Sequence, residues 1–189
     1  MKKIVLFFLV CLFFSNSNYI SAQGKYGFEF ELGAQGVLGS KTGYQKVSPG
    51  IGFFVEGRIN LPESEFDIGL QVSVSTLYRE TSPHIYATSL NPLLLFVSDY
   101  SFKSTRFLSP FVGLGVGAAD CRYDYLEEDS FTGSPIITSF SSYRFAIVPR
   151  IGVELFKHVR VTLDYRLTGS SLSNFICLNI GIVLGGGHR

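Results

Sequence analysis

The feature that most constrains this chain is an alternation of apolar and polar residues that recurs in segments of about ten residues. In residues 26–35, for example, Phe28 and Phe30 alternate with Glu29 and Glu31. A period of two is that of a β-strand, in which successive side chains point to opposite faces of the sheet. No segment with a helical period competes with it in the body of the chain. The pattern therefore predicts an all-β protein.

Eight such segments are predicted, and turn residues separate them. They are residues 26–35, 51–60, 68–79, 88–100, 111–117, 144–155, 159–167 and 176–184. The fourth segment is apolar on both faces at residues 93–97, so its phase stays open. We expect an up-and-down meander that closes as an eight-stranded antiparallel barrel.

The predicted connections alternate in length. Those after the first, third and fifth strands are longer, at about residues 39–49, 80–86 and 122–142, and the intervening ones at 61–66, 101–107 and 156–158 are shorter. Barrels of the bacterial outer membrane have short turns on the periplasmic side and longer loops outside. An even number of strands then places both termini in the periplasm.

The first 22 residues are predicted to be a secretory signal peptide, which leaves residues 23–189 as one barrel domain. A basic start, an apolar run at residues 4–14 and a small residue, Ala22, at the cleavage position are typical of such peptides. Export permits disulfides. Cys121 and Cys177 fall on strands that are not neighbours, so we expect two free thiols.

Three arguments indicate that the apolar face points outward, to lipid. The apolar positions hold about forty large side chains, which would overfill an eight-stranded lumen. Rings fall near strand ends, with Tyr26, Phe28, Tyr100 and Phe156 at one end and Phe53, Tyr78, Phe145 and Tyr165 at the other. Such belts are typical of membrane interfaces. A soluble barrel with an apolar cavity would have the same period with the faces reversed.

The third argument is charge. The polar face holds carboxylates and arginines in equal number, as a dry lumen requires, since an unpaired buried charge is costly. The predicted lumen network is Glu29, Glu31, Glu56, Asp99, Glu154 and Asp164 with Arg58, Arg79, Arg144, Arg150, Arg160 and Arg166. The formal net charge of +1, without a basic stripe, excludes a nucleic-acid partner.

A tight turn at residues 156–158 predicts the register of the two strands that flank it. Opposed residues then have numbers that add up to 314, so Arg150 faces Asp164 and Glu154 faces Arg160 inside the lumen. Ile151 and Leu163 then pair outside. The alternative is a bulged turn, which would shift the pairing by two residues.

Several motifs resemble those of the small OmpA/OmpX-type outer-membrane barrels, in particular the outer membrane protein β-barrel domain group. The segment 110–117 (PFVGLGVG) is similar to that group's Pro-aromatic-x-Gly-x-Gly strand, and segments 148–155 (VPRIGVEL) and 185–187 (GGG) are also similar. The resemblance covers the mature chain. It implies an integral outer-membrane barrel and says little about activity.

The predicted function is that of a non-catalytic, monomeric outer-membrane barrel with a plugged lumen, which serves a structural or surface-interaction role. Its partners would be outer-membrane lipid, lipopolysaccharide, the barrel-insertion machinery and an unidentified extracellular ligand, and no cofactor or metal is expected. The candidate contacts lie in the longest outer loop and are Tyr123, Asp124, Tyr125, Glu127, Glu128, Asp129 and Phe131. The alternatives are a narrow pore and a lipid A deacylase or acyltransferase that acts at the rim through His84, for which no acid partner is evident.

Overall fold

The computed structural model describes residues 27–38, 41–42, 45–61, 64–82, 85–102, 107–128, 135–169 and 174–185. For part of the strand residues near the loop end it describes the backbone alone. The predicted signal peptide, residues 1–22, lies outside the described residues, so its assignment stays a prediction.

The described residues form β-strands joined by turns. The strands are β1 (Gly27–Leu38), β2 (Lys41–Thr42), β3 (Gln45–Ser48), β4 (Gly50–Asn60), β5 (Phe66–Ser82), β6 (Ile85–Ser101), β7 (Leu108–Glu128), β8 (Pro135–Leu155), β9 (Val159–Arg166) and β10 (Phe175–Gly185). The eight longer strands close into an antiparallel barrel, because β1 pairs with both β4 and β10 while β5 pairs with β6. The predicted fold class is confirmed.

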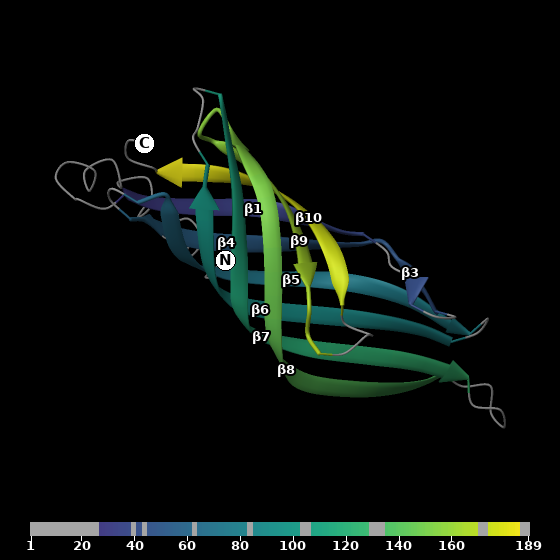
Figure 1. Cartoon of the computed structure of the whole chain (residues 1–189). Coiled ribbons are helices and arrows are strands. Elements are labelled where there is room, and N and C mark those ends of the chain that lie inside the picture. The colour runs from purple at the N-terminus through teal and green to yellow at the C-terminus, as the bar shows by residue number, and fades with distance from the viewer. Residues whose placement is uncertain are drawn as a thin grey trace, which may run out of the picture.

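The two short strands extend the sheet at the end of the barrel where β5 joins β6 and β7 joins β8, here called the loop end. β3 pairs with β5 through Lys46 opposite Glu80, beyond the point at which β4 begins. Figure 1 shows β3 beside the far end of β5, while β6, β7 and β8 continue past the cylinder on the same side. The opposite end, here called the turn end, holds the starts of β1 and β5 and the ends of β4 and β10.

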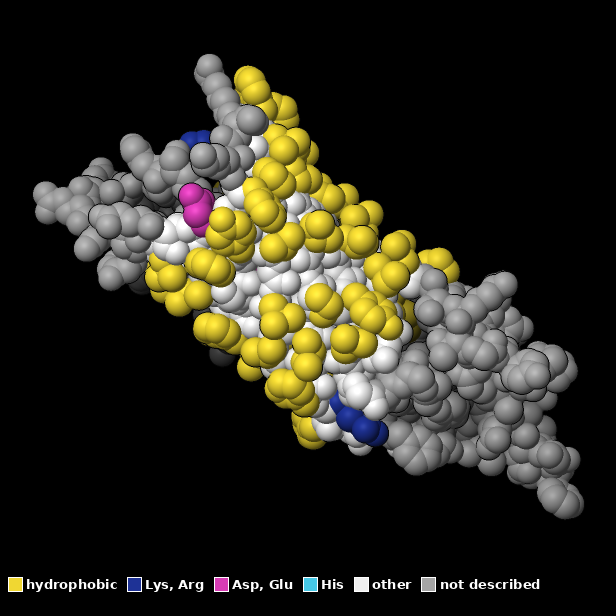
Figure 2. All heavy atoms as spheres, in the orientation of Figure 1, with side chains coloured by type: hydrophobic (Ala, Val, Ile, Leu, Met, Phe, Trp, Pro, Cys, Tyr) yellow, Lys and Arg dark blue, Asp and Glu magenta, His cyan; other side chains and the backbone are white. Residues whose placement is uncertain are grey.

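Apolar side chains occupy the outer face of the barrel. Ile51 and Phe53 are 69% and 65% exposed, whereas the intervening Gly52 is buried. On β10, Ile180 and Ile182 face outward and alternate with the buried Asn179. Figure 2 shows these apolar side chains spread over the middle of the molecule, with the few visible charges near its ends. An apolar exterior of this extent matches a lipid environment.

Aromatic rings mark both borders of this apolar surface. Phe66, Phe102, Phe107 and Phe156 are exposed at the turn end, where Tyr100 makes edge-to-face contacts with Phe66 and Phe102. At the loop end, Phe53, Tyr143, Phe145 and Tyr165 are exposed. Of the ring residues predicted for the two borders, Tyr26 and the side chain of Tyr78 lie outside the described residues. Two rings of aromatic side chains are typical of the two interfaces of a membrane.

The turn at residues 156–158 has the predicted register. Phe156 and Lys157 both have positive φ angles, 54° and 62°, and the backbone N–H of His158 donates to the carbonyl of Leu155. Two successive positive φ angles are those of a type I′ turn, whose twist suits a hairpin. Arg150 lies opposite Asp164 and Glu154 opposite Arg160, as the sum of 314 requires.

The structure answers one question about the strands that the sequence left open, and it corrects one prediction. The phase of β6, which the sequence left open, places Leu93, Leu95 and Val97 inside and Leu94 and Phe96 outside. The predicted loop at residues 122–142 was wrong, since β7 and β8 stay paired without a register shift out to Glu128 opposite Pro135. β5 and β6 likewise continue to Ser82 and Ile85. Apolar and polar residues do not alternate regularly in these segments, so the sequence pattern did not predict strands there.

No helix of the length and hydrophobicity required to cross a bilayer is found among the described residues.

A closed barrel of this kind should resist dodecyl sulfate until it is heated. We expect the purified, unheated chain to migrate faster on a gel than the boiled chain, because the folded form stays compact. Leu163→Pro, in the middle of β9, should abolish the fast band, since proline removes a hydrogen bond from a strand with neighbours on both sides. An unheated wild-type band at the position of the boiled chain would contradict a closed barrel.

Candidate functional site

Arg150 is the centre of an ion-pair network that crosses the lumen in its half toward the turn end. Its Nη1 and Nη2 lie 2.8 Å and 2.8 Å from the two carboxylate oxygens of Glu56. Its Nε and Nη2 lie 2.8 Å and 2.6 Å from those of Asp99. Glu56 is on β4 and Asp99 on β6, neither of which neighbours β8. One guanidinium therefore ties together strands from different sides of the barrel.

Two more arginines extend the network. Arg58 Nη2 lies 2.9 Å from Glu31 Oε2 and 3.7 Å from Glu29 Oε2, and its Nε lies 3.2 Å from Glu56 Oε1. Arg160, on β9, donates to Asp99. At the turn-end side, Asn60 Nδ2 donates to Glu29 Oε1 at 2.8 Å. The network thus involves side chains from β1, β4, β6, β8 and β9.

The charges of this network are almost fully removed from solvent, and each side chain of these ion pairs is at most 7% exposed. Desolvation of a charge is costly, and the geometry of the ion pairs offsets that cost only while every member keeps its partners. Bidentate guanidinium–carboxylate contacts such as that of Arg150 with Glu56 are the strong form of such pairs. The network therefore forms as a unit and fills the lumen at this level.

Glycines opposite the network provide the space that the long side chains need. A Cβ at Gly113 would overlap the Asp99 carboxylate, and one at Gly181 would overlap that of Glu31. A Cβ at Gly152 would lie 2.5 Å from the ring of Phe111. That ring is buried in the lumen, with the Arg160 guanidinium 3.6 Å from its centroid. The cation–π contact is of the kind that desolvation strengthens.

A second polar group lies nearer the loop end. Gln35 Nε2 donates to Asn179 Oδ1 at 2.6 Å, and Asn179 Nδ2 donates to Asp164 Oδ2 at 2.7 Å. Arg166 Nε lies 3.9 Å from Asp164 Oδ1, and the two terminal nitrogens of Arg166 lie 3.2 Å from the hydroxyls of Ser75 and Ser73. This group links β1, β10, β9 and β5 across the lumen.

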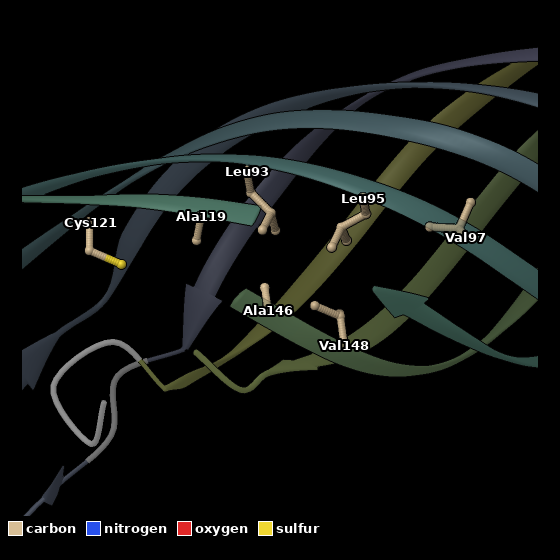
Figure 3. Packing of buried hydrophobic residues seen from close by; sticks show 7 residues of the cluster. All are labelled: Leu93, Leu95, Val97, Ala119, Cys121, Ala146 and Val148. Atoms are coloured by element: carbon tan, nitrogen blue, oxygen red, sulfur yellow. The ribbon is translucent and has the colours of Figure 1, made fainter. Parts of the chain in front are cut away.

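Two clusters of buried apolar side chains lie in the interior toward the loop end. One buried cluster consists of Leu93, Leu95, Val97, Ala119, Cys121, Ala146 and Val148. Figure 3 shows these side chains directed into the barrel from β6, β7 and β8. A smaller cluster holds Val37, Leu77, Phe175 and Cys177. Both cysteines are buried and free, as expected from the sequence.

The predicted lumen residues have five different outcomes. Glu29, Glu31, Glu56, Arg58, Asp99, Arg150 and Arg160 lie in the central network, and Asp164 and Arg166 lie in the second polar group. Glu154 is half-buried near the turn end. The side chain of Arg79 lies outside the described residues. Arg144 was predicted inside the lumen, and it is exposed.

The position of Arg144 follows from the unequal lengths of the strands. β9 ends at Arg166, and its last contact with β8 is an isolated bridge between Ile147 and Leu167. Arg144 has the inward phase, but it lies beyond that bridge, where β8 no longer has β9 beside it. The side chain has left the lumen, and its Nε donates to Ser142 Oγ at 3.1 Å.

The register correctly places Arg150 opposite Asp164, yet their side chains select other partners. Arg150 reaches across the lumen to Glu56 and Asp99, and Asp164 accepts from Asn179 instead. In a barrel this narrow, the facing wall is within reach of an arginine side chain. Cross-strand neighbours therefore do not determine the ion pairs.

The predicted loop contacts lie on the extended β7 or beyond it. The backbone of residues 123–128 is strand, whereas Asp129 and Phe131 lie outside the described residues. Of the side chains concerned, the structure describes that of Asp124, which accepts a hydrogen bond from Ser139 Oγ at 2.6 Å. The structure does not bring these residues together at a described binding site, so their role stays a prediction.

No group of three or more His, Cys, Asp or Glu side chains in the described part of the chain is arranged to hold a metal ion. His84, the candidate base of a rim enzyme, lies outside the described residues.

No protein-family model and no curated protein matches the chain. Among solved structures, the outer membrane protein OprG from Pseudomonas aeruginosa is similar with a TM-score of 0.54 and 12% identity, over 86% of this chain and 96% of that chain. The chain has the fold of a small outer-membrane β-barrel. The attachment invasion locus protein Ail of Yersinia pestis also matches, with a TM-score of 0.48 and 17% identity, over 84% of this chain and 99% of that chain. At these identities the likeness concerns the fold alone.

Several members of this barrel's interior were not singled out from the sequence. Asn60 and Asn179 donate to the predicted charges Glu29 and Asp164. Gln35 donates to Asn179, and Phe111 stacks on Arg160. Each lies at an inward position of a predicted strand. Their inward position in the strand alternation was therefore the available signal. Selecting every polar or aromatic residue at an inward position would have found them.

Removal of the central guanidinium should destabilise the barrel strongly. Arg150→Met leaves Glu56 and Asp99 buried without their main partner, and we expect a loss of about 3–5 kcal/mol in the free energy of unfolding. Arg144→Met, the same substitution at the exposed position of β8, should change it by less than about 0.5 kcal/mol. Urea unfolding in lipid vesicles measures both. Addition of Glu56→Gln to Arg150→Met should recover part of the loss, and equal stability of the two single variants would refute the role of the network.

Proposed function

We propose that this chain is a non-catalytic integral protein of the bacterial outer membrane that acts at the cell surface through the strands that project beyond its apolar belt. Both termini would lie in the periplasm, and outer-membrane lipid and lipopolysaccharide would surround a monomer. The observation that carries the proposal is the contrast between a lumen filled by buried ion pairs and a sheet that continues well past the aromatic border.

The filled lumen argues against a solute pathway. Guanidinium groups from β4, β8 and β9 meet carboxylates from β1, β4 and β6 at one level of the barrel, and these side chains are buried. A pore at this level would require several strong, mutually dependent contacts to break together. A structural or binding role fits this interior better than transport does.

The projecting sheet begins at the aromatic border of the loop end. Tyr143 is 80% exposed on the outer face of β8, and the next two residues of the same phase, Ser141 and Ser139, are exposed and polar. Arg122 Nε donates to Asp120 Oδ2 at 2.7 Å, and Ser141 Oγ donates to Asp120 Oδ1 at 2.8 Å. Polar side chains of this kind are suited to contact with water. Beyond Tyr143 the β7–β8 hairpin continues to Glu128 opposite Pro135, about 26 Å of strand at roughly 3.3 Å per residue.

β6 and β7 are also paired in this region, from Leu90 opposite Arg122 to Tyr86 opposite Leu126. The projecting part is therefore a continuous sheet that comprises β3, β5, β6, β7 and β8. A rigid sheet fixed to a barrel is a suitable platform for recognition at the cell surface.

Site-directed labelling tests the proposed orientation. Ser139→Cys, on the projecting part of β8, should react with a membrane-impermeant maleimide in intact cells. His158→Cys, in the exposed turn at the other end, should react only after the outer membrane is permeabilised. The native thiols are buried and should contribute little signal. Labelling of His158→Cys but not Ser139→Cys in intact cells would refute the proposed orientation.

A further inference from the structure

We propose that the free edge of the projecting part of β8, residues 135–146, binds an extended peptide segment that carries a carboxylate, by addition of a strand to the sheet. The inference rests on the proposed function, because it requires this part of β8 to be at the cell surface. It goes further in naming the binding edge, the chemistry of the partner and the residue that selects it.

The edge exists because the neighbours of β8 differ in length. β7 pairs with β8 along all of Pro135–Leu155. β9 pairs with β8 only from Arg150 to Leu155, followed by the single bridge at Ile147. No described residue pairs with residues 135–146 on the side away from β7. Figure 1 shows β8 at the margin of the projecting strands, with no strand along its outer side.

The bridge at Ile147 identifies the backbone groups that face the free side. The N–H of Ile147 donates to the carbonyl of Leu167 and the N–H of Leu167 donates to the carbonyl of Ile147, at 2.8 Å and 2.9 Å. Both polar groups of Ile147 thus point away from β7. The β7–β8 ladder continues without a register shift, so Ser139, Ser141, Tyr143 and Phe145 have the same orientation. Their N–H and C=O groups form a row that matches one incoming strand.

This edge lacks the usual protection against strand addition. Natural edges are blocked by charged side chains, prolines, bulges or short length. Residues 135–146 read PIITSFSSYRFA, with a single charge, Arg144, and a proline only at the first position. The segment is rich in β-branched and aromatic residues, which favour strands. An unprotected edge of this length is suited to pairing.

Arg144 determines the charge of the partner. It is exposed, and its Nε donates to Ser142 Oγ. No carboxylate of the described residues is within ion-pair distance of Arg144, whereas Arg122 on the neighbouring strand is held by Asp120 at 2.7 Å. The terminal nitrogens of Arg144 are therefore available at the edge. A guanidinium in this state binds a carboxylate best, in a bidentate manner.

Peptide binding to the full chain in lipid nanodiscs tests the inference. The probe is a fluorescent ten-residue peptide of alternating threonine and valine with one central aspartate, and the control probe has lysine in place of the aspartate. By fluorescence anisotropy we expect the acidic peptide to bind roughly tenfold more tightly than the basic one. Arg144→Gln should remove this preference and leave the basic peptide's affinity unchanged or higher.

A pair of variants at one position separates the edge from the rest of the surface. Ser139→Pro removes an N–H that faces the free side, and Ser139→Ala keeps it while also losing the hydroxyl that contacts Asp124. Ser139→Pro should weaken binding of the acidic peptide at least about fivefold relative to Ser139→Ala. Both variants should keep the heat-dependent gel shift, which shows that the barrel folds.

Three outcomes would overturn the inference: no binding of either peptide, equal binding of both peptides to the wild type, or equal binding to Ser139→Pro and Ser139→Ala. These outcomes are distinguishable from failure of the proposed function. If Ser139→Cys is labelled on intact cells and the peptides do not bind, the surface role stands and strand addition does not.

Discussion

The structure depends on the need to pair every charge that a narrow barrel encloses. Eight strands leave an interior that side chains just fill, so water cannot screen the guanidinium and carboxylate groups placed there. Arg150 resolves this constraint by contacts with both Glu56 and Asp99 from across the lumen. Glycines such as Gly113 allow the approach, because a Cβ there would occupy the position of the Asp99 carboxylate. The same arrangement that stabilises the charges also closes the lumen.

The two ends of the barrel differ in structure. Toward the turn end the interior is a charged network, and toward the loop end it holds apolar clusters, with Leu95 and Val148 among their residues, beside the second polar group. The wall also becomes uneven toward the loop end, since β9 ends at Arg166 whereas β8 begins at Pro135. This difference in length moves Arg144 from the lumen to the surface and leaves one side of β8 unpaired. We propose that the closed interior provides rigidity and that the uneven rim provides the surface for recognition.

Much of the fold could be predicted from the sequence because lipid imposes a strict alternation. Wherever one face contacts lipid, most outward residues, such as Leu70 and Ile180, are apolar, and the period identifies the strand and its phase. The alternation disappears beyond the membrane, where both faces of the sheet can be polar. This is why residues 122–142 were expected to be a loop although β7 and β8 continue through them. On β6, residues 93–97 are apolar on both faces, because the outward side contacts lipid and the inward side contacts the apolar cluster.

The partners inside the lumen were less predictable than the strands. Phase placed Arg58, Arg150 and Arg160 inside, but the ion pairs form across the barrel, between strands whose relative heights depend on every intervening register. One turn predicted that Arg150 is opposite Asp164, and the pairing is present, yet the side chain bonds to residues of β4 and β6. A pattern of charges in a sequence gives most of the charged members of such a network and not its connections.

The most direct test of the account is the depth of single tryptophans in a bilayer, since the chain has none of its own. Val72→Trp lies on the outer face in the middle of β5, and Phe156→Trp lies at the turn-end border. If apolar side chains face lipid while the charges are sealed inside, lipids brominated deep in their acyl chains should quench Val72→Trp most. Lipids brominated near the headgroup should quench Phe156→Trp most. Strong quenching of Val72→Trp by aqueous iodide, with no effect of brominated lipid, would contradict the account.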